Sequence, residues 1–138
     1  MRTLVTPAKA LTLALLILLA PIIVHAQSIP DFGQLEERLH IRSEQKEQYD
    51  RAVGATKLAM LAVGLAAIEM KNAFAAELAK DRPDFRALAR KQNELIEQQR
   101  PLFQEAGREW QKLYRLMDPD QVQAARAYLN DNLGRLFQ

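Results

Sequence analysis

Apolar side chains recur every three or four residues along most of this chain, a spacing that predicts α-helices. No segment alternates apolar and polar residues over the length of a strand, and no Asn-Gly dipeptide is present to turn a tight hairpin. Four helices are expected, over residues 31–39, residues 43–80, a third stretch to about residue 117, and residues 119–137. The sequence therefore predicts an all-α fold: a long antiparallel helical hairpin with a short N-terminal helix and a C-terminal amphipathic helix.

The third helix has clear start and interior signals. Asp81 is the expected N-cap with Pro83 in the first turn, which starts the helix soon after residue 80. Pro101 removes one backbone hydrogen bond and crowds the preceding turn, so the hairpin is expected to be bent there. A heptad seam runs along the helix: Phe85, Leu88, Leu95, Leu102, Ala106, Leu113 and Met117.

The start of the last helix shows three coincident signals. Asp118 is a good N-cap, because its carboxylate can accept from free backbone N–H groups. Pro119 suits the first helical position, where its missing N–H costs nothing. Gln121 lies three residues after the cap, where its side chain can reach back to the N–H of the cap. A fainter version of this pattern precedes the second helix, from Ile41 to Gln45.

Residues 1–26 have the pattern of a secretory signal peptide. Arg2 and Lys9 form a positive region, residues 11–24 are apolar except for Thr12, and Ala26 ends a small-residue cleavage signal. The apolar stretch is short for a membrane-spanning helix, which favours cleavage over an uncleaved anchor. We expect an exported, periplasmic protein without stable membrane insertion after cleavage, whose single domain is residues 27–138.

Composition excludes several classes of function for that domain. Without Arg2 and Lys9, 17 basic residues face 17 acidic ones, so no net charge favours nucleic acid or an anionic membrane. The chain has no cysteine, and His40 is the one histidine after the leader, so an imidazole or thiolate metal site is not expected. No nucleophile–histidine–acid set or phosphate-binding glycine loop is present. The sequence predicts no enzyme, no metal and no cofactor.

One segment is more apolar than a helical hairpin needs. Residues 58–68 contain no polar side chain, and a helix that is apolar all round must be covered on more than one side. Either the terminal helices cover it, or part of it meets a second subunit or an unfolded client. Phe103 and Trp110 leave a similar choice between core and binding face. We expect a homodimer with Leu58, Leu61, Leu65 and Ile68 at or near its interface.

With these features the chain resembles the Spy/CpxP family of small periplasmic proteins, which is defined by two LTxxQ motifs. The second motif is similar to the segment Met117, Asp118, Pro119, Asp120 and Gln121. The first is similar to the segment from Ile41 to Gln45, with Arg42 where the family has threonine. Capping at that helix start is therefore in doubt or shifted to Ser43. The apolar segment 58–68 is a further departure from the family.

The resemblance implies a curved helical dimer without enzymatic activity. We expect an ATP-independent chaperone of the periplasm that binds exposed apolar segments of client proteins, with a role in envelope stress. The alternative is a dimeric adaptor that binds the periplasmic domain of a membrane sensor kinase. Both functions need an amphipathic helical face, and the sequence does not separate them.

Overall fold

The computed structural model describes residues 30–136, with side chains to residue 132. The expected signal peptide lies outside the described residues, as do the side chains of Leu133 and Leu136. The described chain consists of four helices and no strand: α2 (Phe32–Leu39), α3 (Ser43–Leu78), α4 (Phe85–Leu116) and α5 (Pro119–Leu136). This confirms the predicted all-α class.

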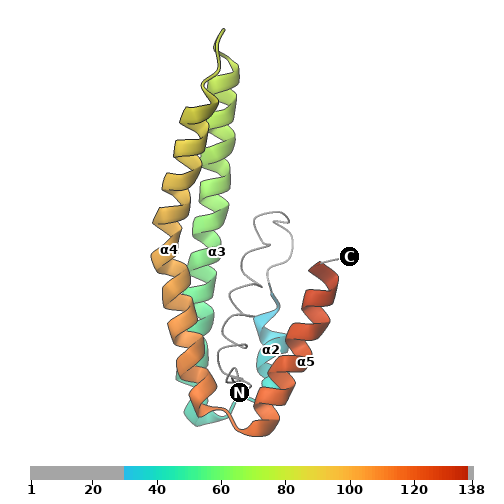
Figure 1. The fold of residues 1–138 in the computed structure, drawn as a ribbon. Helices are drawn as coiled ribbons and strands as arrows, with labels where there is room; N and C mark the ends of the chain where they lie inside the picture. Colours follow the sequence, from blue (N-terminus) through green and yellow to red (C-terminus); the bar gives the residue numbers. More distant parts are fainter. Residues whose placement is uncertain (1–29, 137–138) are drawn as a thin grey trace, which may run out of the picture.

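Helices α3 and α4 form an antiparallel hairpin, and α2 and α5 lie side by side next to its base (Figure 1). Side chains far apart in sequence meet across the hairpin. Gln48 donates to the Glu109 carboxylate at 2.8 Å near the base, and Lys91 pairs with Glu69 further up. Above α2 and α5 the hairpin has no third layer within the described part of the chain (Figure 1).

The turn at the tip differs from the sequence prediction. The N-cap of α4 is Asp84 and not Asp81: its carboxylate accepts from the Ala87 N–H at 3.0 Å. The Asp84 N–H in turn donates to the Glu77 carboxylate at 2.9 Å. Pro83 disfavours helical geometry in the residue before it, so the helix begins after the proline and not around it.

The predicted seam of α4 is buried in its interior and open at its tip. Leu88, Leu95, Ala106 and Leu113 are buried, and Leu102 and Met117 are half-buried. Phe85, expected in the same seam, is the first residue of α4 and is 64% exposed. The helix continues without interruption through Pro101.

The largest side chains of the core gather at the base. Trp110 stacks on Phe32 with ring centroids 6.5 Å apart and meets the edge of Tyr49 at 5.9 Å. Its indole N–H donates to the Thr56 hydroxyl at 2.7 Å, so the buried polar atom is satisfied. The other members of this cluster are Leu35, Leu39, Ala52, Val53, Leu113, Ala125, Tyr128 and Leu129. All four helices therefore contribute to the base.

Candidate functional site

The glutamines of the two motif-like segments meet at the base of the hairpin. Gln45 and Gln121 are 1% and 4% exposed. Each side-chain amide donates to the oxygen of the other, at 3.0 Å from Gln45 and 2.7 Å from Gln121. We call this reciprocal pair the glutamine clasp.

Every remaining hydrogen-bonding position of the clasp is also used. The second amide hydrogen of Gln45 goes to the Leu116 carbonyl at 2.7 Å, and that of Gln121 to the Leu39 carbonyl at 3.0 Å. The two amide oxygens accept from the backbone N–H groups of Arg42 and Asp118, each at 3.1 Å. A primary amide has two donors and two acceptor positions, so both side chains are fully satisfied. Such a pair stabilises when whole and is costly to break, because a lone buried amide loses its partners.

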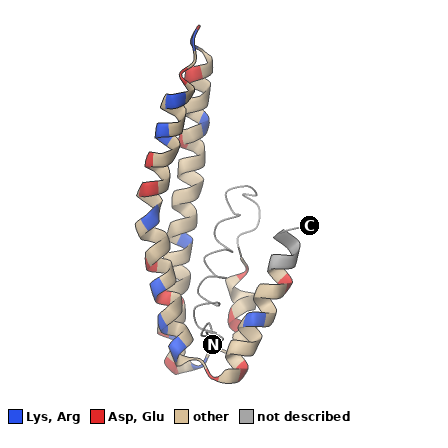
Figure 2. Cartoon of the chain, in the orientation of Figure 1, with Lys and Arg blue, Asp and Glu red and all other residues tan. Residues whose placement is uncertain are grey.

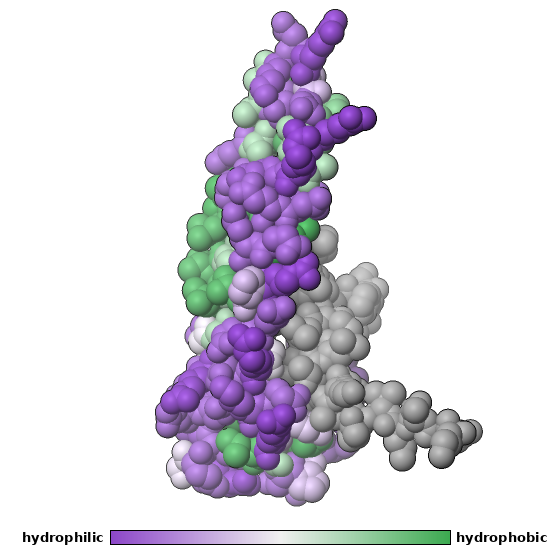
Figure 3. Space-filling model, turned by 60° about the vertical axis from the view of Figure 1, so that its left-hand side comes forward, coloured by the Kyte–Doolittle hydropathy of each residue, from purple (hydrophilic) through white to green (hydrophobic). Residues whose placement is uncertain are grey.

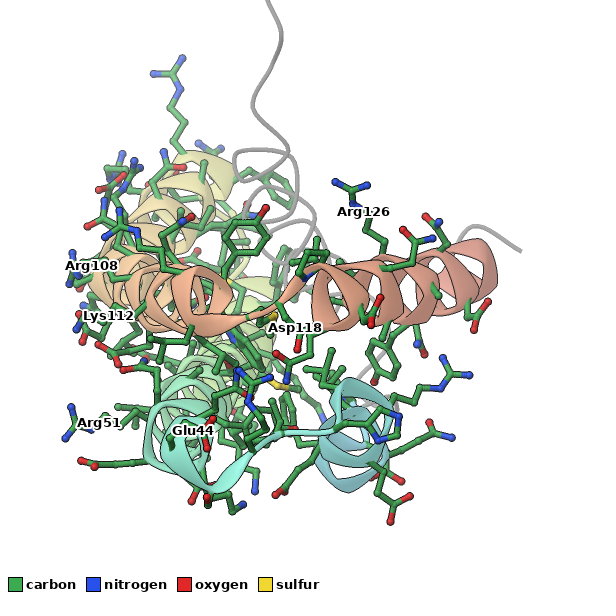
Figure 4. All side chains as sticks on the ribbon, turned by 90° about the horizontal axis from the view of Figure 1, so that it is seen from below. Glu44, Arg51, Arg108, Lys112, Asp118 and Arg126 are labelled. Atoms are coloured by element: carbon green, nitrogen blue, oxygen red, sulfur yellow. The ribbon has the colours of Figure 1, made fainter. Side chains whose placement is uncertain are left out.

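Asp118 caps α5 as the sequence predicts. Its carboxylate accepts from the Gln121 N–H at 2.9 Å, and Gln121 returns the bond to the Asp118 N–H. The Gln121 backbone N–H lowers the pKa of Asp118, and the Arg42 guanidinium lowers the pKa further. In the view from below, Asp118 lies where α4 ends and α5 begins (Figure 4).

Arg42 stands where an LTxxQ motif would have threonine, and its side chain makes different contacts. It occupies the N-cap position of α3, but a guanidinium has no acceptor and makes no side-chain cap. Instead its Nη1 donates to the Asp118 carboxylate and its Nε to Glu44, both at 2.7 Å. Ser43 is the first residue of α3 and does not replace the cap. Arg42 therefore links the two helix starts from the solvent side of the clasp.

A second feature lies on the outer face of α3, away from α4. Leu58, Leu61, Leu65 and Ile68 are 53–59% exposed, and we call these four residues the apolar stripe. Apolar surface of the hairpin's midsection borders a hydrophilic face (Figure 3). Helices α2 and α5 do not cover the stripe. The alternative in which the terminal helices bury residues 58–68 is therefore wrong for these four side chains.

The two helices of the hairpin differ in their outer faces. Lysine, arginine, aspartate and glutamate follow one another along α4, whereas the middle of α3 is nearly free of charge (Figure 2). Exposed pairs such as Arg100 with Glu97 and Arg108 with Glu105 lie on α4.

By length and composition α3 could cross a membrane, with 22% of its most apolar 18-residue window buried. Its run without any polar side chain is residues 58–68.

Trp110 and Phe103 do not belong to the stripe. Trp110 is 4% exposed and lies in the base cluster, so it is a core residue and not a client contact. Phe103 is half-buried.

A small apolar cavity of about 20 Å³ lies beside Trp110, between α2, α4 and α5. It has room for little more than one water molecule and offers no polar lining group, so it is not a ligand site.

The site has no group arranged for catalysis among the described residues. His40 is exposed in a left-handed conformation (φ 46°) at the end of α2. In residues 30–136 no cluster of three or more metal-ligating side chains occurs. The arrangement consists of a packed base and an exposed apolar face on α3.

Comparisons of this chain with protein-family models, curated proteins and solved structures found no match. The arrangement of the described residues is therefore the basis for the functional proposal.

Proposed function

We propose that this protein is a periplasmic, non-enzymatic binding protein of the Spy/CpxP type that acts as an ATP-independent chaperone. The apolar stripe carries the proposal. Soluble monomers rarely leave large contiguous apolar surface in water without a binding function. Four large aliphatic side chains on one face of α3, each more than half exposed, offer that surface to unfolded segments.

The surroundings of the stripe support a broad choice of client. No charged side chain lies between Lys57 and Glu69 on α3, so no fixed charge selects a particular partner sequence. The glutamine clasp and the aromatic base hold α3 in place without using the stripe. The protein can then bind through a preformed face and lose little conformational entropy on binding.

The test is suppression of client aggregation by protein purified after expression of the full-length chain. A urea-denatured client is diluted into buffer with a stoichiometric amount of the protein, and light scattering is followed. The double variant Leu61→Gln/Leu65→Gln should lose most of the suppression. The matched control Ile96→Gln/Leu116→Gln changes two exposed apolar residues of α4 and should retain it. No suppression by the parent protein would rule out the chaperone function.

A dimeric adaptor for a sensor kinase is the second candidate. The stripe favours it in one respect: its members lie at regular spacing on a rigid helix, which suits a helix of a folded partner. Specific capture of a folded periplasmic sensor domain, together with unchanged client scattering, would favour the adaptor. Mass spectrometry of the exported protein tests the proposed location, with Gln27 as the expected first residue.

A further inference from the structure

The tip of the hairpin is the end furthest from the packed base (Figure 1). We define the tip as residues 71–90, which comprise the end of α3, the turn and the start of α4. Three large apolar side chains of the tip lie in water: Phe74 is 43%, Leu78 62% and Phe85 64% exposed. None of the three belongs to the apolar stripe, so the tip is a separate exposed surface.

The tip carries a surplus of positive charge. Residues 71–90 contain five basic and three acidic side chains, a net charge of +2. The rest of residues 27–138 contains 12 of the 17 basic and 14 of the 17 acidic side chains, a net charge of −2. The domain is neutral as a whole, but its charge is distributed unevenly along the hairpin, and the tip is the positive end.

Two of the three carboxylates of the tip are engaged within the hairpin. The Glu77 carboxylate accepts from Lys80 and from the Asp84 N–H, and the Asp84 carboxylate caps α4 at the Ala87 N–H. Only Asp81 makes no such bond in the described part of the tip. Three exposed cations of the tip, by contrast, form no ion pair within residues 30–136: Lys71, Arg82 and Arg86.

Apolar side chains beside unpaired cations fit the surface of a bilayer with anionic headgroups. Phenylalanine and leucine enter the boundary between headgroups and acyl chains, while lysine and arginine extend to the phosphates. A protein partner fits less well, because a stable protein interface takes about 20–30 residues on each side and the end of a two-helix hairpin offers fewer. A bilayer needs no surface of matching shape. The uneven charge also turns the tip toward an anionic surface and the base away from it.

We propose that the tip docks reversibly on the surface of a phospholipid bilayer that contains anionic lipids, with the base directed away from the bilayer. Leu78 and Phe85 enter the headgroup boundary, and Arg82 and Arg86 bind lipid phosphates. From Leu78 back to Ile68 the helix rises about 15 Å, and such docking buries apolar groups only about 5–10 Å deep. The apolar stripe therefore stays uncovered beside the membrane, and the docking does not rest on the proposed chaperone function.

Vesicle flotation tests the docking. Protein purified after expression of the full-length chain is mixed with vesicles of phosphatidylcholine alone, or with vesicles that contain about one third phosphatidylglycerol. The parent protein should float with the anionic vesicles, and its partition coefficient should be at least about tenfold lower on the neutral ones. Added salt should weaken the binding, because it screens the charges. Equal binding to both kinds of vesicle, or binding to neither, would overturn the docking.

Charge variants locate the contact on the molecule. Arg82→Gln/Arg86→Gln should lower the partition coefficient on anionic vesicles at least about tenfold, at roughly fivefold for each cation. The matched control Arg100→Gln/Arg108→Gln removes the same charge from α4, where each arginine pairs with a glutamate, and should bind nearly as well as the parent. Equal losses in the two variants would overturn the tip as the site. All proteins compared have the same N-terminus, checked by mass spectrometry, so residues 1–26 do not account for a difference.

The apolar part of the contact is tested separately. Leu78→Gln/Phe85→Gln should lower the binding to anionic vesicles severalfold, because two exposed apolar side chains of the tip are lost. Ile96→Gln/Leu116→Gln changes two exposed apolar residues outside the tip and should leave the binding unchanged. Unchanged binding in Leu78→Gln/Phe85→Gln would overturn the entry of these side chains into the bilayer.

Client scattering distinguishes the docking from the proposed function. Without vesicles, Arg82→Gln/Arg86→Gln should suppress client aggregation as well as the parent, because the stripe is intact. A parent protein that floats with anionic vesicles but does not suppress aggregation would support the docking and refute the chaperone function. A parent protein that suppresses aggregation but does not float would refute the docking alone.

Discussion

The base of the molecule and the distal half of its hairpin use the same two helices for opposite purposes. At the base, α3 and α4 are joined by α2 and α5 around an aromatic cluster, and the buried polar groups are paired. In the distal half, α3 packs on α4 through small residues such as Ala59 and Val63 and turns larger ones outward. The aromatic side chains of the core are thus buried at the base, whereas the large aliphatic side chains of the stripe on α3 are exposed.

Under the proposed function, this difference separates the residues of α3 that stabilise the fold from those that bind a client. Substitutions near Gln45 and Trp110 should change the free energy of unfolding, whereas substitutions in the stripe should leave it nearly unchanged. Exposed positions usually alter stability by less than about 0.5 kcal/mol. The contrast can be tested from either end of the hairpin.

Trp110→Ala should have the largest effect. Removing a buried tryptophan costs roughly 3–5 kcal/mol, because the aromatic contacts with Phe32 and Tyr49 are lost and a cavity remains. Urea unfolding followed by circular dichroism measures the change. Phe103→Ala on the same helix is the control and should cost clearly less, since Phe103 is only half-buried. Equal losses in the two variants would contradict the concentration of stability at the base.

Gln121→Leu should follow at roughly 2–3 kcal/mol, because the buried Gln45 amide loses two of its four hydrogen bonds and the Leu39 carbonyl loses the bond from Gln121. Gln123→Leu, on the exposed face of α5, should have little effect. In the double variant Gln45→Leu/Gln121→Leu the total cost should be less than the sum of the two single costs, which is the signature of a coupled pair. Strict additivity in urea unfolding would show that the clasp is not a unit.

Gly64→Ala tests the distal half and should have the opposite sign. Alanine is favoured over glycine in a helix by roughly 0.5–1 kcal/mol, and the added Cβ meets nothing within 4 Å. The monomer, measured by urea unfolding at low concentration, should be more stable. Gly33→Ala is the control: its Cβ would lie 3.3 Å from the Asp31 carboxylate that caps α2, so the gain should be smaller. A destabilised Gly64→Ala would indicate close packing that the structure does not contain.

The smallest expected effect is on pH dependence at the base. The folded-state pKa of Asp118 is lowered by the Gln121 N–H and by Arg42. Its ionised form therefore contributes stability above the ordinary aspartate pKa of about 3.9, and this contribution is lost as the pH falls through the lowered value. In the variant Asp118→Asn the new amide would still cap the helix but would not titrate. The melting temperature of this variant should fall by less than that of the parent between pH 6 and pH 3.

Other carboxylates with lowered pKa values also make the stability of both the parent and Asp118→Asn depend on pH. The pKa values of Glu77 and Glu109 are also lowered, mainly by hydrogen bonds from Lys80 and Lys112. These two groups and Glu44, whose pKa is also lowered, remain in the variant and contribute to its remaining acid sensitivity. Identical pH profiles for the parent and Asp118→Asn would show that the ionised carboxylate adds nothing to the cap.

Local patterns predicted most of the fold. Helical spacing and caps placed α2, α3 and α5 to within a few residues, and the Asp118 cap with the returning Gln121 bond was confirmed in full. The start of α4 was wrong because two aspartates flank Pro83, and only the position of Glu77 shows which of them caps. The exposure of the stripe was left open because it depends on where α2 and α5 pack.

The long-range contacts of the base could not be read from the sequence. Gln45 and Gln121 were each recognised as residues at a helix start, but their mutual hydrogen bonds depend on two helix starts meeting in space. The partnership of Thr56 with Trp110 was missed for the same reason. A threonine inside a helix gives no local signal of a distant indole. At Arg42 the sequence left the cap in doubt or shifted to Ser43, and it gave no sign of the bridge from Arg42 to Asp118.

The clasp also sets an order of events during synthesis. Its two glutamines are 76 positions apart in the sequence. Because a chain is synthesised from its N-terminus, Gln45 has no partner until most of the domain has been made. The turn at residues 79–84 needs only neighbouring residues, and the hairpin can zip from there toward the termini with small loop-closure costs. Throughout that interval the stripe is already present on a growing helix whose base is still open. Closure of the clasp therefore requires most of the domain, and a chain that ends before residue 121 lacks the second glutamine.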